Sequence, residues 1–154
     1  MHDHDSPEAD ALANHEVMDQ VRRGEVSMED FFPVIHSYTR AEALEDGVLV
    51  DVSQRASEAG FVFPAALTAR VWADLQDIPE VFEGTQDVEG RLWDLLMVLK
   101  HTIKAGAKER EIRFSFGMPT SGAPQRLAHY EAKSVAGPGD DAEPVLTILA
   151  PDED

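Results

Sequence analysis

The sequence predicts an α+β fold, in which an antiparallel sheet of three to four strands packs with several short helices and one long central helix. Two patterns carry this prediction. Apolar residues recur at helical spacing over residues 87–105, and apolar and polar residues alternate with a period of two in the C-terminal third. Because the helical segments mostly precede the strands, an α+β arrangement is favoured over a doubly wound parallel sheet.

The N-terminal part is expected to hold little regular structure. Residues 1–12 are polar and acidic, so we expect a disordered leader ahead of a single α+β domain that spans residues 13–154. Short helices are expected over residues 13–23 and from Ser27, because serine is a favoured cap and acids follow it.

The next segment alternates short helices with one strand. Thr39 and Glu42 form a capping box, which predicts a short helix that ends at Gly47. Residues 48–52 are rich in valine and are expected to form a strand. Ser53 is expected to cap a further helix, which a glycine at position 60 closes.

Residues 61–75 are expected to form a short apolar segment, broken by a proline, and then a helix. Pro64 breaks the run that precedes it, since proline cannot donate to a sheet ladder. Thr68 is then expected to cap a helix that contains Trp72 and Leu75.

The longest predicted helix runs from about Asp87 to Ala105. Six apolar side chains share one face at helical spacing: Val88, Leu92, Leu95, Leu96, Leu99 and Ile103. Trp93 and Met97 widen that face, so the helix is expected to be central or to meet a second surface. Lysines near its end suit the helix dipole.

The C-terminal third predicts three antiparallel strands. Ile112, Phe114 and Phe116 alternate with polar residues, residues 127–135 contain alternating segments, and residues 145–149 are rich in β-branched and apolar side chains. The sequence Gly-Pro-Gly-Asp-Asp at 137–141 is expected to form the turn between the last two strands. The strand at 48–52 is a candidate fourth member of the sheet.

Charge is the most distinctive feature of the composition. The chain has 154 residues with 30 acidic and 13 basic side chains, for a net charge of −17 at neutral pH. Such a field repels nucleic acid and anionic membranes and attracts basic surfaces. The acidity therefore either keeps the protein in solution or is itself a binding surface for a basic protein partner.

Signatures of catalysis are weak. There is no cysteine, which excludes disulfides and thiolate sites and fits a reducing cytoplasm. His2 and His4 alternate with aspartates, but a disordered leader does not hold ligands in place, so no metal and no cofactor are expected. His36, His101 and His129 each have a structural explanation, and no phosphate loop or nucleophile elbow is present.

Three functions remain open from the residues alone. The leading hypothesis is a non-enzymatic, acidic protein-binding module, and six acids around a loop and a helix start are its expected partner-binding residues: Asp74, Asp77, Glu80, Glu83, Asp87 and Glu89. The second is a small enzyme or ligand-binding domain, with Tyr38, Arg40, Asp51 and Ser53 near one pocket. The third is a homo-oligomeric accessory protein that uses the apolar face around Trp93 and Met97, so monomer and homodimer both stay open.

Several runs of the sequence resemble a known family. They are Phe31–Ser53, with Tyr38–Ser53 the most specific part, Ala59-Gly60-Phe61 with the residues from Pro64 to Thr68, Gly90–Asp94, and Gly137–Asp141 before the final strand. Together they resemble an uncharacterised domain-of-unknown-function family of small bacterial proteins, often carried on plasmids and mobile elements. The resemblance covers roughly Phe31 to the C-terminus and implies no catalytic residues.

This setting suggests a more specific form of the leading hypothesis. By analogy, small acidic proteins of mobile elements can block a host defence enzyme by occupying its DNA-binding surface, as anti-restriction and anti-CRISPR inhibitors do. Surface carboxylates can replace phosphates before a lysine- and arginine-rich channel. We therefore expect a DNA-mimic-like inhibitor in the cytoplasm that contacts neither nucleic acid nor membrane directly.

Overall fold

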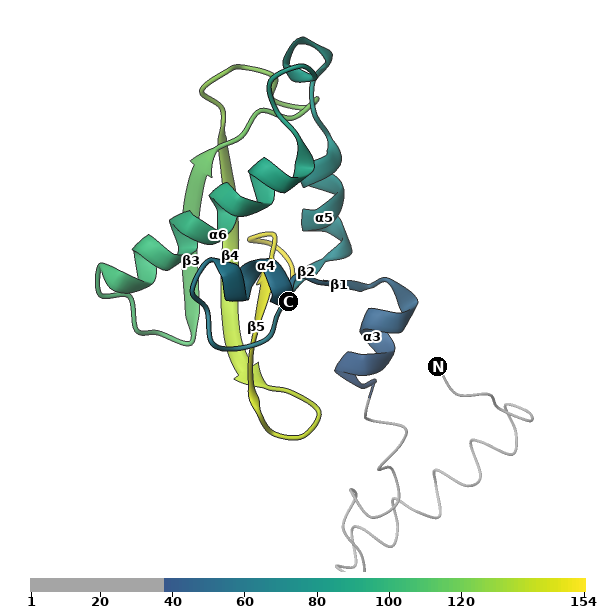
Figure 1. Ribbon diagram of the computed structural model, residues 1–154, viewed down its shortest axis with the longest axis vertical. Coiled ribbons are helices and arrows are strands. Elements are labelled where there is room, and N and C mark those ends of the chain that lie inside the picture. Colours follow the sequence, from purple (N-terminus) through teal and green to yellow (C-terminus); the bar gives the residue numbers. More distant parts are fainter. Residues whose placement is uncertain (1–37) are drawn as a thin grey trace, which may run out of the picture. The chain divides into compact units, whose positions relative to one another are not determined.

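The computed structural model describes residues 38–154, and the elements predicted before Tyr38, the leader included, lie outside the described residues. Residues Arg40–Asp154 form one compact unit. Its elements in chain order are α3 (Arg40–Asp46), β1 (Leu49–Asp51), α4 (Ser53–Glu58), β2 (Ala65–Thr68), α5 (Ala69–Gln76), the 3-10 helix η1 (Glu80–Phe82), α6 (Val88–Lys104), β3 (Glu111–Gly117), β4 (His129–Pro138) and β5 (Pro144–Leu149), as Figure 1 shows.

The sheet has five strands in the order β1-β2-β5-β4-β3. The predicted antiparallel meander is present as β3, β4 and β5, and β1 pairs with β2 in antiparallel fashion. The prediction of a purely antiparallel sheet of three to four strands was wrong, because β2 lies parallel to β5 and joins β1 to the meander. The α+β class holds, and the sheet is mixed.

The missed strand β2 has an unusual sequence for a strand. Its four residues are Ala-Ala-Leu-Thr, and all four are buried because β2 lies between β1 and β5. A strand that is buried on both faces shows no alternation, and alanine has a low strand propensity. Pro64 precedes the strand, where its missing N–H costs nothing, and its carbonyl oxygen accepts a hydrogen bond of 2.9 Å from Leu146 N.

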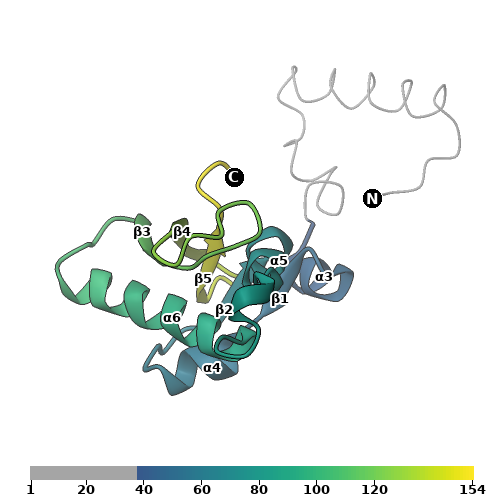
Figure 2. The same ribbon diagram turned by 90° about the horizontal axis from the view of Figure 1, so that it is seen from above.

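Side chains of α4, α5 and α6 share one core with the sheet, and Figures 1 and 2 show α4 and α6 on the same side of it. The predicted long helix corresponds to α6, and Asp87 and Ala105 are its caps. Leu92, Leu95, Leu96 and Leu99 are each at most 2% exposed, and they pack with Phe114 and Phe116 of β3 in one core. Trp93 and Met97 are half-buried against the same core.

The structure confirms three of the expected helix-end residues, Thr68, Gly47 and Gly60, and corrects one, Ser53. Thr68 Oγ1 accepts from Val71 N at the start of α5, and Gly47 and Gly60 have φ values of 80° and 103° after α3 and α4. Ser53 does not cap α4, whose cap residue is Val52 with no side-chain hydrogen bond. The Ser53 hydroxyl bonds instead to Asp51 and to the backbone of Ala65, because the chain places β2 directly beside it.

Within residues 38–154, no helix has both the length and the apolar character that a bilayer crossing requires.

Candidate functional site

A buried arginine organises one end of the domain. Arg91, on the first turns of α6, is only 3% exposed. The last carbonyl groups of α5 have no partner within that helix and need outside donors. Arg91 Nη1 donates to the carbonyl oxygens of Leu75 and Asp77 at 3.4 and 3.3 Å, so the guanidinium closes the end of α5.

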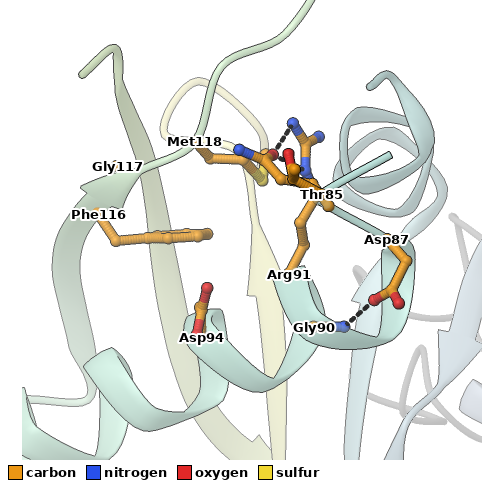
Figure 3. Close-up of a pocket in the computed structure, with 9 residues that line it drawn as sticks. Thr85, Asp87, Gly90, Arg91, Asp94, Phe116, Gly117 and Met118 are labelled. Atoms are coloured by element: carbon orange, nitrogen blue, oxygen red, sulfur yellow. Dashed lines mark hydrogen bonds between the residues drawn. The ribbon is translucent and has the colours of Figure 1, made fainter. Parts of the chain in front are cut away.

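The same guanidinium also holds the two loops that follow α5 and β3. Its Nε and Nη2 atoms donate to Gln86 Oε1 at 3.1 and 3.0 Å, and Nη2 also donates to the carbonyl oxygen of Pro119. Figure 3 shows the guanidinium pointing away from the α6 axis towards these loops. Burial lowers the pKa of Arg91 from its ordinary value, and the charge of Asp77 opposes that shift.

A second set of contacts ties the two loops together. Asp77 Oδ2 accepts hydrogen bonds from Ser121 N at 3.1 Å and from Ser121 Oγ at 2.7 Å. Beside it, Asp74 Oδ2 accepts from the Tyr130 hydroxyl at 2.6 Å. Burial, together with this hydrogen bond to a carboxylate, raises the pKa of Tyr130 far above its ordinary value. The loops therefore have a fixed attachment at their bases.

We name residues 77–87 the acidic loop. Of the six acids expected to contact a partner protein, four have bonding partners within the domain and two are exposed. Asp74 and Asp77 are bound as described, Asp87 caps α6 through Gly90 N at 2.7 Å, and Glu89 Oε1 lies 2.9 Å from Arg55 Nε. Glu80 and Glu83 are exposed on either side of Val81, whose side chain is 77% exposed. The acidic loop thus presents two carboxylates and one apolar side chain to solvent.

A separate cavity of about 200 Å³ lies beside α3. Arg40, Asp51 and Ser53 line it together with Asp140 and Glu143 from the turn between β4 and β5, and apolar residues complete the wall. The expected convergence of the Tyr38–Ser53 segment is thus present for three of its four residues. Tyr38 precedes the unit that contains the cavity, and its side chain is 54% exposed.

Hydrogen bonds fix most polar groups of this cavity. Arg40 Nη1 donates to Thr147 Oγ1 at 2.7 Å and Nη2 to the carbonyl oxygen of Leu146 at 2.8 Å. Asp140 accepts from the backbone N–H groups of Arg40 and Ala41 at 2.7 and 2.9 Å, and so anchors the start of α3. Burial lowers the pKa of Arg40, against the opposing charges of Asp140, Asp51 and Glu143. One cation therefore faces three carboxylates.

A groove runs along the seam between α6 and β3. One part, of about 180 Å³, begins at Thr85 and Gln86 of the acidic loop and reaches Asp94 and Phe116. The next part, of about 230 Å³, shares Asp94 and Phe116 with the first. It continues past Met97, Val98 and His101. Figure 3 shows the Asp94 carboxylate directed from α6 towards the side where the Phe116 ring lies.

The remaining residues singled out from the sequence lie apart from these sites. His129 is exposed at the start of β4, and His36 lies outside the described residues. Arg55 lies over the Trp93 ring, 5.7 Å from its centre, and Lys100 Nζ donates to the carbonyl oxygen of Ala59 at 2.8 Å. Between Tyr38 and the C-terminus, no group of three or more histidine or acidic side chains could hold a metal ion.

Sequence reasoning missed Arg91, Asp140 and Glu143. An arginine on the otherwise apolar face of α6 was the available signal for Arg91, since a charged residue there must find partners when it is buried. The roles of Asp140 and Glu143 had no local signal, because Asp140 bonds to the start of α3 across 100 residues of chain and Glu143 lines the same cavity from the same turn.

Comparison with known proteins gives one match. The model of a family of unknown function, DUF6573, matches residues 28–154. The expected relation to an uncharacterised family is therefore confirmed, over nearly the stretch that the sequence indicated. No curated protein and no solved structure matches the chain.

Proposed function

The chain belongs to DUF6573, a family of unknown function, and we propose that it is a non-enzymatic, acidic module that binds a basic surface of a partner protein. One observation carries the proposal: the buried guanidinium of Arg91 anchors an acidic loop that directs Glu80 and Glu83 into solvent. A loop held at its base loses less conformational freedom on binding than a mobile one.

The composition of the acidic loop suits a protein partner. A net charge of −17 draws a basic surface from a distance, while Val81 offers an exposed apolar contact at the centre of the loop. Protein interfaces likewise combine charged and apolar side chains. Leu127, on the loop that Ser121 attaches to Asp77, is a second exposed apolar side chain, at 83%.

The partner class that fits best is an enzyme that itself binds nucleic acid. Its lysine- and arginine-rich channel is complementary to carboxylates in the way it is to phosphates. In the bacterial cytoplasm, on a plasmid or other mobile element, such a module would inhibit a host defence enzyme. This setting follows from the resemblance of the sequence.

The experiment is capture from a bacterial lysate with elution by rising salt, in which Glu80→Lys/Glu83→Lys is compared with Glu45→Lys/Glu131→Lys. Both double variants have the same net charge, and all four residues are exposed. We expect the first variant alone to lose a partner that elutes at high salt. Equal loss in both variants would mean that net charge, and not the acidic loop, attracts the partner, and would contradict the proposal.

A second candidate function is ligand binding in the cavity beside α3, and the convergence of Arg40, Asp51 and Ser53 favours it. Because three carboxylates surround one engaged guanidinium, the ligand class that fits is a small organic cation. Putrescine is a suitable probe, with Asp51→Asn and the distant Glu131→Gln as the paired variants. Calorimetry should detect binding that Asp51→Asn weakens and Glu131→Gln does not; no heat with the wild-type protein would remove this candidate.

A further inference from the structure

We propose that the groove between α6 and β3 receives an extended, basic segment of the partner, which pairs with the free edge of β3 and places a lysine or arginine side chain against Asp94. This inference rests on the proposed function, since it specifies how a basic partner is held. Edge pairing beside a helix is a recurring mode of peptide recognition, in which the backbone supplies affinity and a side-chain pocket supplies specificity.

The edge of β3 is long enough to serve as a template. β3 is the last strand of the sheet, and among residues 38–154 only β4 pairs with it. Its seven residues, Glu111–Gly117, leave every second backbone N–H and C=O group pointing away from the sheet. Such a row of groups pairs readily with another chain.

The groove lies where the side chains of an added strand would point. Phe116 faces α6, as its burial in the core shows, and a neighbouring strand would run about 4.8 Å from β3. A side chain of that strand beside Phe116, on the same face of the sheet, enters the space that Asp94, Met97 and Val98 line. This position is therefore the specificity pocket of the proposed site.

The chemistry of the pocket selects a long cationic side chain. Met97 and Phe116 provide apolar surface for the aliphatic stem, and the Asp94 carboxylate, which is exposed, provides the counter-charge. Arg91, the arginine that lines the groove, is directed at carbonyl oxygens and Gln86, so these contacts do not neutralise Asp94. Towards the acidic loop the groove adds the carboxylate of Asp87.

The test uses the full chain, labelled with nitrogen-15, and a capped eight-residue peptide in which lysine alternates with valine. We expect the amide signals of residues 111–117 and 94–101 to shift together on titration. Asp94→Asn should weaken binding roughly fivefold, the effect of losing one partly exposed ion pair. Glu45→Gln, on α3, is the matched control and should leave the affinity unchanged.

One further peptide separates strand addition from charge attraction. A peptide of the same charge with proline at two central positions cannot pair along β3 and should bind at least tenfold more weakly. Equal binding of the two peptides, or unchanged signals of residues 111–117, would overturn the inference. A change in the β3 signals with protein concentration alone would overturn it too, because it would assign the edge to a second copy of the chain.

The outcome is separable from that of the proposed function. The variant Glu80→Lys/Glu83→Lys should still shift the β3 signals with the peptide, even where it fails to capture the partner. If the peptide leaves β3 unaffected while the lysate partner still depends on the acidic loop, the groove inference fails and the proposed function stands.

Discussion

Replacement of Arg91 by methionine tests how the acidic loop is held. Methionine keeps the apolar stem and removes the guanidinium, which leaves the carbonyl oxygens of α5 and of Pro119 without their donor. The contacts to Gln86 and Pro119 are worth about 1.5 kcal/mol each, and the longer contacts to α5 add about 1 kcal/mol together. Since the burial of a cation is itself unfavourable, the net loss in the free energy of unfolding should be about 2–3 kcal/mol.

The assay is urea denaturation followed by the fluorescence of Trp72 and Trp93, which lie on α5 and α6 beside the substituted position. Arg91→Lys, which keeps the charge but not the forked donor geometry, should fall between wild type and Arg91→Met. Arg126→Met, at an exposed position, is the control and should change stability by less than about 0.5 kcal/mol. A loss below about 1 kcal/mol for Arg91→Met would refute the reasoning that these contacts stabilise the loops.

Three further predictions concern other parts of the domain. Asp140→Ala removes the acceptor for two N–H groups of α3 and should lower the free energy of unfolding by about 1 kcal/mol. Amide hydrogen exchange should become faster only in residues 40–46, and unchanged exchange there would count against the anchoring role. Thr68→Val removes the cap of α5 and the donor to Glu153. Thermal unfolding should show that the free energy of unfolding falls by about 1 kcal/mol, and a stability equal to that of the wild type would show that neither bond contributes. In an alkaline absorbance titration, Tyr130 should ionise only together with unfolding. Because the folded-state pKa of Tyr130 is raised, its contribution to stability is complete below about pH 10 and is lost as the pH rises further. Asp74→Asn should bring the ionisation of Tyr130 to lower pH, and ionisation of Tyr130 in the folded wild type near pH 10 would contradict the buried hydrogen bond.

The parts of the fold that the sequence predicts well are those that local patterns determine. The apolar spacing of α6 fixes which side chains enter the core, and the alternation at Ile112, Phe114 and Phe116 fixes the face of β3. The glycines at positions 47 and 60 end their helices where the backbone needs positive φ. In each case neighbouring residues carry enough information to specify the conformation.

Other features depend on partners far along the chain, and the sequence does not reveal them. The four residues of β2 form a strand only because β1 and β5 flank them. Ser53 bonds to Ala65 instead of capping α4 for the same reason. The guanidinium of Arg91 donates to the carbonyl oxygens of Leu75 and Pro119. The residues next to Arg91 in the sequence do not indicate these partners.

In the candidate sites, too, the sequence predicts contacts between residues that are close in the chain and does not predict those between distant ones. Arg40, Asp51 and Ser53 lie close together in the sequence and flank short elements, so their convergence could be predicted, whereas the contribution of Asp140 could not. Among the acids of the 74–89 segment, the sequence does not separate those with structural partners, such as Asp77 and Asp87, from those directed into solvent.

The most direct test of the central claim is the affinity of the captured partner for the wild-type chain and for Glu80→Lys/Glu83→Lys, measured by calorimetry across a series of salt concentrations. If the acidic loop binds a basic surface, the wild-type affinity falls steeply as salt rises, and the variant shows both a weaker affinity and a shallower dependence on salt. An affinity that is independent of salt, or a variant that binds as the wild type does at every concentration, would contradict the claim.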